Sequence, residues 1–141
     1  MLGFIYSFFS VIGFGIVFNL PIKLLPAAAL SGAIGQAGYD IVIHYFNSPT
    51  TATVVAAVII GLLGEIMARL YKKPATLFVI PGIIPLVPGS YIYQAMLSLV
   101  QGNMKSAGQY GLLTVFLSIG IAAGLMAVTT FWNIFFGSHK K

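Results

Sequence analysis

An apolar run interrupted by prolines and glycines is the feature that most limits how this chain can fold. Residues 77–100 are apolar enough to lie in a bilayer, yet Pro81, Pro85 and Pro88 cluster in their middle with two glycines. Proline donates no backbone hydrogen bond and disturbs the preceding helical turn. Irregular backbone at membrane depth is tolerated only where protein buries it or a water-filled cavity solvates it. We therefore expect a broken helix of the kind that forms substrate sites in transporters.

The composition of the chain indicates an integral membrane protein. Of its 141 residues, 59% are hydrophobic and only 6% are charged, whereas a soluble domain carries about 25% charged residues. The sequence has no cysteine, which excludes a disulfide framework and a thiolate metal site. Two histidines far apart in sequence make a poor metal set, so neither a metal nor another cofactor is expected. The net charge of +5 is better explained by basic loops that orient membrane spans than by nucleic-acid binding.

Five apolar segments of membrane-spanning length follow one another with short joins. Each is near or above the ~20 residues that cross a ~30 Å hydrocarbon core. No basic residue precedes the first segment, which is therefore expected to be a retained span rather than a cleaved signal peptide. Residues 1–141 are predicted to form a single domain, an all-α integral membrane bundle of five transmembrane helices with the fourth one broken. The spans are predicted at about 2–20, 24–46, 51–70, 75–100 and 109–136.

The basic residues predict how these spans are oriented. With five spans, six basic residues lie on one side of the membrane and only Lys105 lies on the other. The basic side is read as cytoplasmic, so the N-terminus is predicted outside and the C-terminus inside. If residues 77–100 were a re-entrant loop, the chain would have four spans and a less decisive split of five against two. The six residues are Lys23, Arg69, Lys72, Lys73, Lys140 and Lys141.

The proline-rich run carries a family resemblance. Residues 79–89 read Val-Ile-Pro-Gly-Ile-Ile-Pro-Leu-Val-Pro-Gly, and Phe18–Pro21, Gly64–Arg69 and Lys73–Thr76 agree with the family in order and spacing. Tyr93 follows the motif as it does in the family. Together these residues resemble the threonine/serine exporter (ThrE) family, in particular the short YjjB-like subunits that match the C-terminal half of the fused exporters. The likeness covers almost the whole chain.

This resemblance implies a membrane subunit that exports small amino or carboxylic acids from a bacterial cell, across its inner membrane. It also implies a YjjP-like partner subunit, which matches the N-terminal half of the fused exporters. Relatives are linked to threonine and serine export, and the paired short subunits to export of dicarboxylates such as succinate, so the substrate stays open. A non-transporting accessory or scaffold subunit is the alternative. A membrane enzyme is not expected, because no set of nucleophile, base and orienting group is visible.

The second half of the broken span is predicted to bind the substrate carboxylate. We expect Pro81–Gly89 to be irregular, Ser90 to be an N-cap, and Tyr91–Val100 to form a half-helix. The free N–H groups and the positive dipole end at its start favour an anion. A proline-kinked helix that only shapes the bundle is the alternative. The predicted substrate-binding residues are Pro81, Gly82, Pro85, Pro88, Gly89, Ser90, Tyr93 and Gln94.

Two pairs that contain an acidic residue are candidates for proton coupling or gating. Glu65 and Arg69 lie four residues apart on the third predicted span, where acid before base forms a favourable helical pair. An acid within a span is a functional hypothesis by default, and a purely structural pair is the alternative. Asp40 and His44 share a face of the second span and could relay protons. A solvated helix end is the favoured interpretation of that second pair.

Small residues recur within two of the predicted spans. Ala29, Ala33 and Ala37 are spaced by four residues in the second span, and Gly120 and Gly124 form a GxxxG pattern in the fifth. Small residues let helices approach closely where lipid supplies no hydrophobic drive. Packing within the bundle is the favoured interpretation, and a dimer seam is the alternative.

Overall fold

The chain folds into helices that follow the predicted apolar segments closely. The computed structural model describes residues 2–136, and no strand occurs among them, so the all-α prediction is confirmed. Two short 3₁₀ turns, η1 and η2, precede α2 and follow α4. The elements in chain order are α1 (Leu2–Val17), η1 (Ile22–Leu24), α2 (Leu25–Phe46), α3 (Pro49–Tyr71), α4 (Thr76–Ile83), η2 (Ile84–Leu86), α5 (Gly89–Val100) and α6 (Met104–Phe136).

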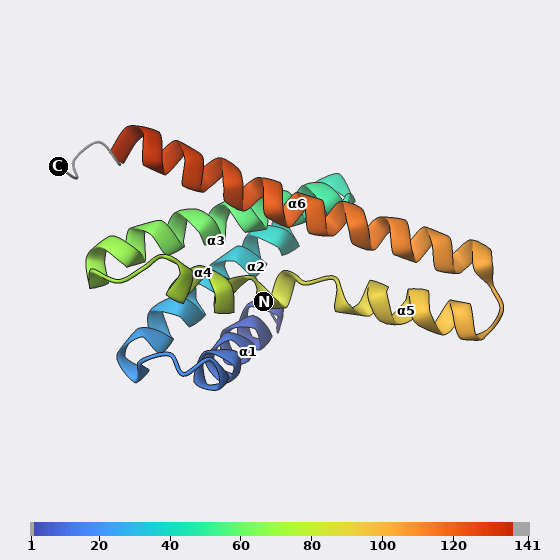
Figure 1. Cartoon of the computed structure of the whole chain (residues 1–141), viewed down its shortest axis with the longest axis horizontal. Coiled ribbons are helices and arrows are strands. Elements are labelled where there is room, and N and C mark those ends of the chain that lie inside the picture. Colours follow the sequence, from blue (N-terminus) through green and yellow to red (C-terminus); the bar gives the residue numbers. More distant parts are fainter. Residues whose placement is uncertain (1, 137–141) are drawn as a thin grey trace.

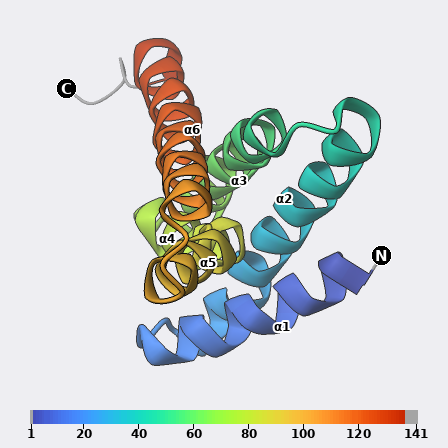
Figure 2. The ribbon, with the colours of Figure 1, turned by 90° about the vertical axis from the view of Figure 1, so that its right-hand side faces the viewer.

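The helices form a packed bundle with one projecting hairpin. Helix α2 packs against α1, α3 and α4, while α6 packs against α3 (Figures 1 and 2). Helix α5 and the first part of α6 extend away from α1–α4 as an antiparallel pair (Figure 1). The buried apolar core lies mainly between α1, α2 and α4, and it includes Val11, Ala28 and Phe78. No residue of α5 is fully buried, so the hairpin contributes little to this core.

Local sequence explains where several helices begin and end. Pro26 is the second residue of α2 and Pro49 is the first residue of α3, positions in the first turn where a missing N–H breaks no helical hydrogen bond. Asn19 and Asn47 follow α1 and α2 in the left-handed backbone region, with φ of 59° and 49°. Asparagine tolerates this conformation better than most residues. The turns that separate the first three helices are therefore encoded locally.

Helix length and apolarity support two to three membrane crossings in the described part of the chain. Helices α3 and α6 are each long and apolar enough to cross a membrane. The pair formed by Thr76–Leu86 and α5 is bent by 45° and provides a third crossing if it is counted as one span. Helix α1 has only 16 residues, and α2 falls outside the set that passes this test. The predicted count of five spans is therefore not confirmed by these measures.

The break in the fourth segment is shorter than predicted. Helix α4 continues through Pro81 to Ile83, although the proline cannot donate the hydrogen bond that an N–H at this position would make. After η2, only Val87 and Pro88 lie outside helical structure before α5 begins at Gly89. Pro88, and not Ser90, therefore occupies the N-cap position of α5.

Close approach at small residues holds the bundle together. A Cβ placed on Gly32 of α2 would lie 3.1 Å from the carbonyl oxygen of Gly82 in α4. A Cβ on Gly124 of α6 would lie 3.0 Å from the carbonyl oxygen of Val54 in α3. A Cβ on Gly120 would meet the Val54 side chain at 3.1 Å. The GxxxG pattern thus packs inside the chain, as bundle packing predicts, and is not left open as a dimer seam.

Candidate functional site

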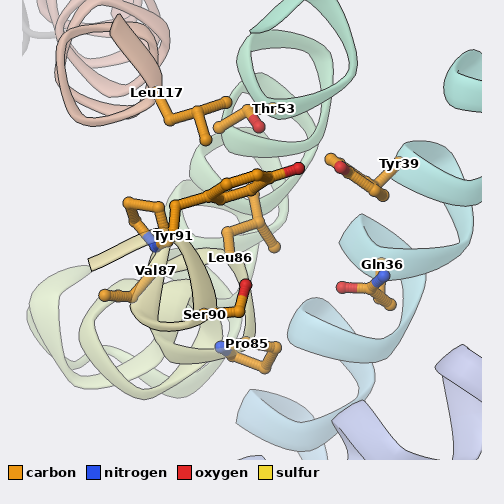
Figure 3. A pocket seen from close by; sticks show the side chains of 10 residues that line it. Gln36, Tyr39, Thr53, Pro85, Leu86, Val87, Ser90, Tyr91 and Leu117 are labelled. Carbon is orange, nitrogen blue, oxygen red and sulfur yellow. The ribbon is translucent and has the colours of Figure 1, made fainter. Parts of the chain in front are cut away.

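A polar cavity lies beside the break between η2 and α5, and we call it the break cavity. Its volume is about 150 Å³. Helices α2, α3, α5 and α6 and the break itself all contribute to its wall (Figure 3). No acidic or basic side chain is among the lining residues, although five of them carry a hydroxyl or an amide. The lining consists of Gln36, Tyr39, Thr53, Pro85, Leu86, Val87, Pro88, Ser90, Tyr91 and Leu117.

Backbone hydrogen-bond donors without a helical acceptor lie at the break, in residues that line this cavity. Val87 is extended, with φ −59° and ψ 129°, and the N–H of Gly89 turns back to the carbonyl of Val87 at 2.7 Å. Helix α5 starts without a side-chain cap. The first N–H groups of a helix have no acceptor within that helix, which here concerns Ser90 and Tyr91. Because both residues line the cavity, the start of α5 can offer N–H groups and a positive dipole end to an anion.

Hydroxyl groups approach the cavity from three helices. The phenol oxygens of Tyr39 on α2 and Tyr91 on α5 are directed toward each other across the cavity (Figure 3). The Thr53 hydroxyl of α3 donates to the carbonyl of Pro49 at 2.8 Å. Its proton is therefore engaged, and its oxygen is left as an acceptor. The cavity can form hydrogen bonds of both kinds with a small polar molecule.

Gln36 connects the break cavity to Asp40. The Nε2 of Gln36 donates to the Oδ1 of Asp40 at 3.1 Å, one helical turn further along α2. Asp40 also lines a second cavity, an apolar groove of about 440 Å³ between α1 and α2. Its other lining residues are Phe4, Ile5, Ala37 and Ile41. The Gln36–Asp40 hydrogen bond therefore lies between two cavities.

The structure brings three of the eight predicted substrate-binding residues to the break cavity. These are Pro85, Pro88 and Ser90. Pro81 and Gly82 are buried one turn earlier, where α4 crosses α2. A Cβ on Gly82 would lie 3.2 Å from the Oγ of Ser31 on α2. The first Pro-Gly pair thus lies at the contact between α4 and α2.

The other three predicted binding residues lie on α5 away from the cavity wall. A Cβ on Gly89 would meet no atom within 4 Å, and Gln94 is exposed. Tyr93 is 66% exposed, while Tyr91 lines the cavity. Residues two apart on a helix point in different directions, which explains why only one of these tyrosines faces the cavity. A role for Gly89, Tyr93 and Gln94 in binding stays a prediction.

Four polar lining residues were not singled out from the sequence: Gln36, Tyr39, Thr53 and Tyr91. A signal for two of them was present. Gln36 and Tyr39 are three residues apart on a segment otherwise rich in small residues, so they share a face of α2. Thr53 and Tyr91 carried no such signal, because their convergence depends on how α3 and α5 pack.

The predicted coupling residues lie at different places in the fold. The guanidinium of Arg69 lies over the ring of Trp132, 5.0 Å from its centroid, and joins α3 to the C-terminal part of α6. Glu65 is half-buried on α3, and neither residue lines the break cavity. His44 is exposed near the end of α2, as a solvated helix end predicts. Asp40 is hydrogen-bonded to Gln36, a side chain of the cavity wall.

Fold and site together define an all-helical membrane protein in which a broken helix opens onto a polar cavity. A match to the family described as "Threonine/Serine exporter, ThrE" extends over residues 3–131. The chain therefore belongs to the threonine/serine exporter family, and the resemblance seen in the proline-rich run is confirmed. Members of this family are exporter-type transporters rather than enzymes.

Comparison with individual proteins and with solved structures gives less information about the function of this chain. A protein of Haemophilus influenzae described as "Uncharacterized protein" is 33% identical over 97 residues, which is 69% of this chain and 33% of that protein. The matched region thus spans about a third of the length of this curated relative. No solved structure matches the chain.

Proposed function

We propose that the chain is the membrane subunit of a secondary exporter of small amino or carboxylic acids, and that the substrate binds in the break cavity. The main support for this proposal is that the proline motif of an exporter-family chain lies beside a cavity lined by converging polar groups. Drug-sized ligands use pockets of about 300–1,000 Å³. A cavity of about 150 Å³ is suited to a much smaller molecule.

We propose that the substrate carboxylate binds at the start of α5. Ser90 and Tyr91 line the cavity there, and their N–H groups have no acceptor within the helix. Their hydroxyls and that of Tyr39 add further hydrogen bonds. Amino acids and dicarboxylates both carry the carboxylate that such a site would bind.

The proposed topology has five spans, an external N-terminus and a cytoplasmic C-terminus in a bacterial inner membrane. In Figure 1, the turns that hold Lys23 and Lys72 and the C-terminal end of α6 lie on the left of the molecule. The α2–α3 turn and the α5–α6 turn beside Lys105 lie on the right. This alternation supports the predicted separation of basic residues. Lys140 and Lys141 lie outside the described residues.

Helix α2 is included as a span because its polar residues face neighbouring helices. Gln36 and Asp40 are both half-buried, and most of the first half of α2 is buried. A helix enclosed by protein on several sides does not need the apolarity that a lipid-facing helix needs. Cysteine labelling at Ser48, in the α2–α3 turn, tests this: modification from the cytoplasmic side only would contradict the topology.

A YjjP-like partner subunit of opposite overall orientation is part of the proposal. Transporters often bind substrate between inverted repeats, and an odd number of spans cannot itself form two equal inverted halves. Helix α5 has no buried residue, and Tyr93, Met96 and Val100 expose large apolar surfaces. The hairpin of α5 and α6 thus has surface available for a partner. Full transport by the chain alone as a homo-oligomer would contradict this part.

Proton coupling through Glu65 and Arg69 is also proposed. Glu65 is the acidic residue of α3 and is half-buried within a helix apolar enough to span a membrane. An ionisable group at such a position is a functional candidate by default. Glu65→Gln should abolish coupling to a pH gradient and leave the folded protein in the membrane. Normal pH-driven flux in this variant would reduce Glu65 to a structural role.

Transport into inverted vesicles tests the central proposal. The chain and its partner are assayed with labelled threonine, serine and succinate, with and without a pH gradient. Ser90→Ala and Tyr91→Phe should each reduce flux of the true substrate, whereas variants on the exposed face of α5 provide the control for expression. If both variants transport like the parent, the break cavity is not the substrate site.

Gly89→Val is a second test of the site. A Cβ at this position meets no atom within 4 Å, so the first carbon of the added side chain lies in open space. Loss of transport with normal expression would indicate that the backbone at Gly89 approaches the substrate closely. Unchanged transport would exclude such an approach.

A non-transporting accessory subunit is the second candidate function. The projecting hairpin of α5 and α6 favours it, because an exposed apolar hairpin can serve assembly alone. Substrate flux separates the two functions. If variants of the cavity lining leave flux through the assembled complex unchanged, the accessory role is the better description.

A further inference from the structure

The groove between α1 and α2 combines an apolar wall with one acidic side chain. It has a volume of about 440 Å³ and lies where the first turns of α1 meet the second half of α2. Ile5 and Ile41 are 48% and 58% exposed, so the groove is open on the outside of the single chain. Its lining residues are Phe4, Ile5, Ala37, Asp40 and Ile41, and of these Asp40 alone carries a polar side chain.

The Asp40 carboxylate has hydrogen-bonding capacity that the described chain leaves unused. Its Oδ1 accepts a hydrogen bond from the Nε2 of Gln36 at 3.1 Å. Its Oδ2 lies against the backbone of α1, where a Cβ added to Gly3 would be 2.6 Å away. Within residues 2–136, Gln36 is the one side chain that forms a hydrogen bond or ion pair with Asp40. A carboxylate has about four acceptor sites, so most of them stay open.

The described chain places no lysine or arginine beside this carboxylate. Helix α1 contains no charged residue, and Lys23 lies in η1, at the other end of α1 and α2. His44 follows Asp40 by one turn and is exposed near the end of α2. Acidic residues within membrane spans are costly and usually pair with another charged group. The groove therefore has room for a cation that the described chain does not supply.

We propose that the α1–α2 groove receives a transmembrane helix of the partner subunit, and that a lysine or arginine on this helix pairs with Asp40. This inference rests on the proposed partner and adds a docking site separate from the hairpin of α5 and α6. Apolar side chains of the helix fill the groove, while the charged pair fixes its depth and rotation. Asp40 then acts in assembly, and proton coupling stays with Glu65 and Arg69.

The depth of Asp40 favours a helix over a lipid headgroup as the source of the cation. Asp40 precedes Phe46, the last residue of α2, by six residues, which places it about 9 Å inside the end of the helix. The ammonium of a phospholipid lies in the headgroup region outside the hydrocarbon core. A helix can present a basic side chain at any depth. A lipid in the groove would instead put its acyl chains against the carboxylate.

A second copy of the chain has no described basic residue at this depth. Lys105 follows the α5–α6 turn, which extends beyond α1 and α2 on the right of Figure 1. The other basic residues in the described part belong to η1, the last turn of α3 and the turn after it, at the opposite end of the bundle. Copies that share one membrane orientation cannot bring these groups to Asp40. The base is therefore expected on a different polypeptide.

Single cysteines test where the partner docks, because the natural chain has no cysteine. Ile5→Cys and Ile41→Cys carry a photo-activated crosslinker in the assembled complex. Ile134→Cys is the matched control, because Ile134 is also exposed but lies near the C-terminal end of α6, across the bundle from the start of α1 (Figure 2). We expect adducts with the partner subunit at positions 5 and 41 and none at position 134. Adducts with a second copy, or with lipid alone, would overturn the proposal.

Co-purification of the co-expressed partner subunit tests the charged pair. Asp40→Leu should recover about tenfold less partner than the parent, because the partner's base is left without its counter-charge. His44→Leu, one turn further along α2, is the matched control and should recover as much partner as the parent. Asp40→Lys should also lose the partner, and aspartate in place of one basic residue within the partner's spans should restore it. If no such replacement restores binding, the pair with Asp40 is wrong.

A variant that fills the groove keeps the test decisive if Asp40→Leu fails to fold. Ala37→Phe leaves the carboxylate in place and should also reduce recovery of the partner, because its ring occupies the apolar groove. Normal recovery with Ala37→Phe, or with folded Asp40→Leu, would overturn the docking site.

The outcomes separate this inference from the proposed function. If the partner binds the parent and every groove variant equally, the docking site is wrong, while the effect of Ser90→Ala and Tyr91→Phe on flux still decides the substrate site. If no partner co-purifies with the parent, both the docking site and the proposed partner subunit are wrong.

Discussion

The two Pro-Gly pairs of the broken segment have the same sequence and opposite surroundings. Pro81-Gly82 lies within α4 and is buried, and a Cβ on Gly82 would lie 3.0 Å from the Cγ2 of Ile60. Pro88-Gly89 begins α5, and a Cβ on Gly89 would meet nothing within 4 Å. The first pair lets two helices cross closely, whereas the second lies where the chain changes direction and α5 begins. The same dipeptide therefore serves packing at one end of the segment and the site at the other.

The difference extends to the two regions that these pairs belong to. Within the bundle, Gly32, Gly64 and Gly124 each face a side chain or carbonyl of another helix at close range. In the hairpin, Gly102, Gly108 and Gly111 have no such neighbour. Close helix approach supplies the attraction that lipid does not provide, so the bundle is held by its small residues. The hairpin lacks this support in the single chain.

The largest expected effect is on stability and comes from filling the buried pair. Gly82→Val should lower the free energy of unfolding by about 1–3 kcal/mol, because the added carbons meet Ile60 and Ser31. Thermal unfolding of the purified protein measures this. Gly89→Val is the matched control and should unfold like the parent. Equal destabilisation by both substitutions would remove the distinction between the two pairs.

A change on the cavity side of α5 should have the next largest effect, and it acts on substrate binding. Tyr91→Phe should weaken binding by about 1–3 kcal/mol, roughly fivefold to 150-fold, because a buried polar group loses its partner. Tyr93→Phe tests the predicted role of Tyr93 and should have a smaller effect, because this side chain is exposed in the single chain. Affinity for threonine or succinate measures both. The reverse order of effects would move the binding face of α5 to Tyr93.

A smaller effect is expected where α6 meets the end of the bundle. Arg69→Leu removes the guanidinium from the ring of Trp132 and should lower stability by about 0.5–1 kcal/mol. Lys73→Leu, in the exposed α3–α4 turn, is the control for loss of one positive charge. A double-mutant cycle with Trp132→Leu isolates the pair. No coupling energy between positions 69 and 132 would show that this contact does not hold α6 to α3.

The smallest effect is expected from the conservative change at the second pair. Gly89→Ala should alter the free energy of unfolding by no more than about 0.5 kcal/mol, since its side chain enters open space. Gly82→Ala, with its Cβ at 3.0 Å from Ile60, should cost more. One denaturation experiment measures the free energy of unfolding of both alanine variants. The difference between the two values compares the packing at Gly82, in the bundle, with that at Gly89, in the hairpin.

The sequence by itself determined the helical fold, the helix boundaries within a few residues, and the position of the break. Apolar run length, Pro26 and Pro49 at helix starts, and Asn19 and Asn47 at helix ends act through neighbouring residues only. The proline-rich run also carried the family membership. Of the site, it indicated Pro85, Pro88 and Ser90, because the break and the first turn after it are local features.

Tertiary structure alone decided which side chains meet at the break. Tyr91 faces the cavity and Tyr93 does not, because the rotation of α5 is set by its packing against α6 and not by its own sequence. Gln36, Tyr39 and Thr53 join the site from helices separated from it by 30 or more residues, so no short-range pattern could bring them together. The prolines interrupt the helix through a local effect. Which polar groups line the cavity at this interruption depends on contacts between distant segments.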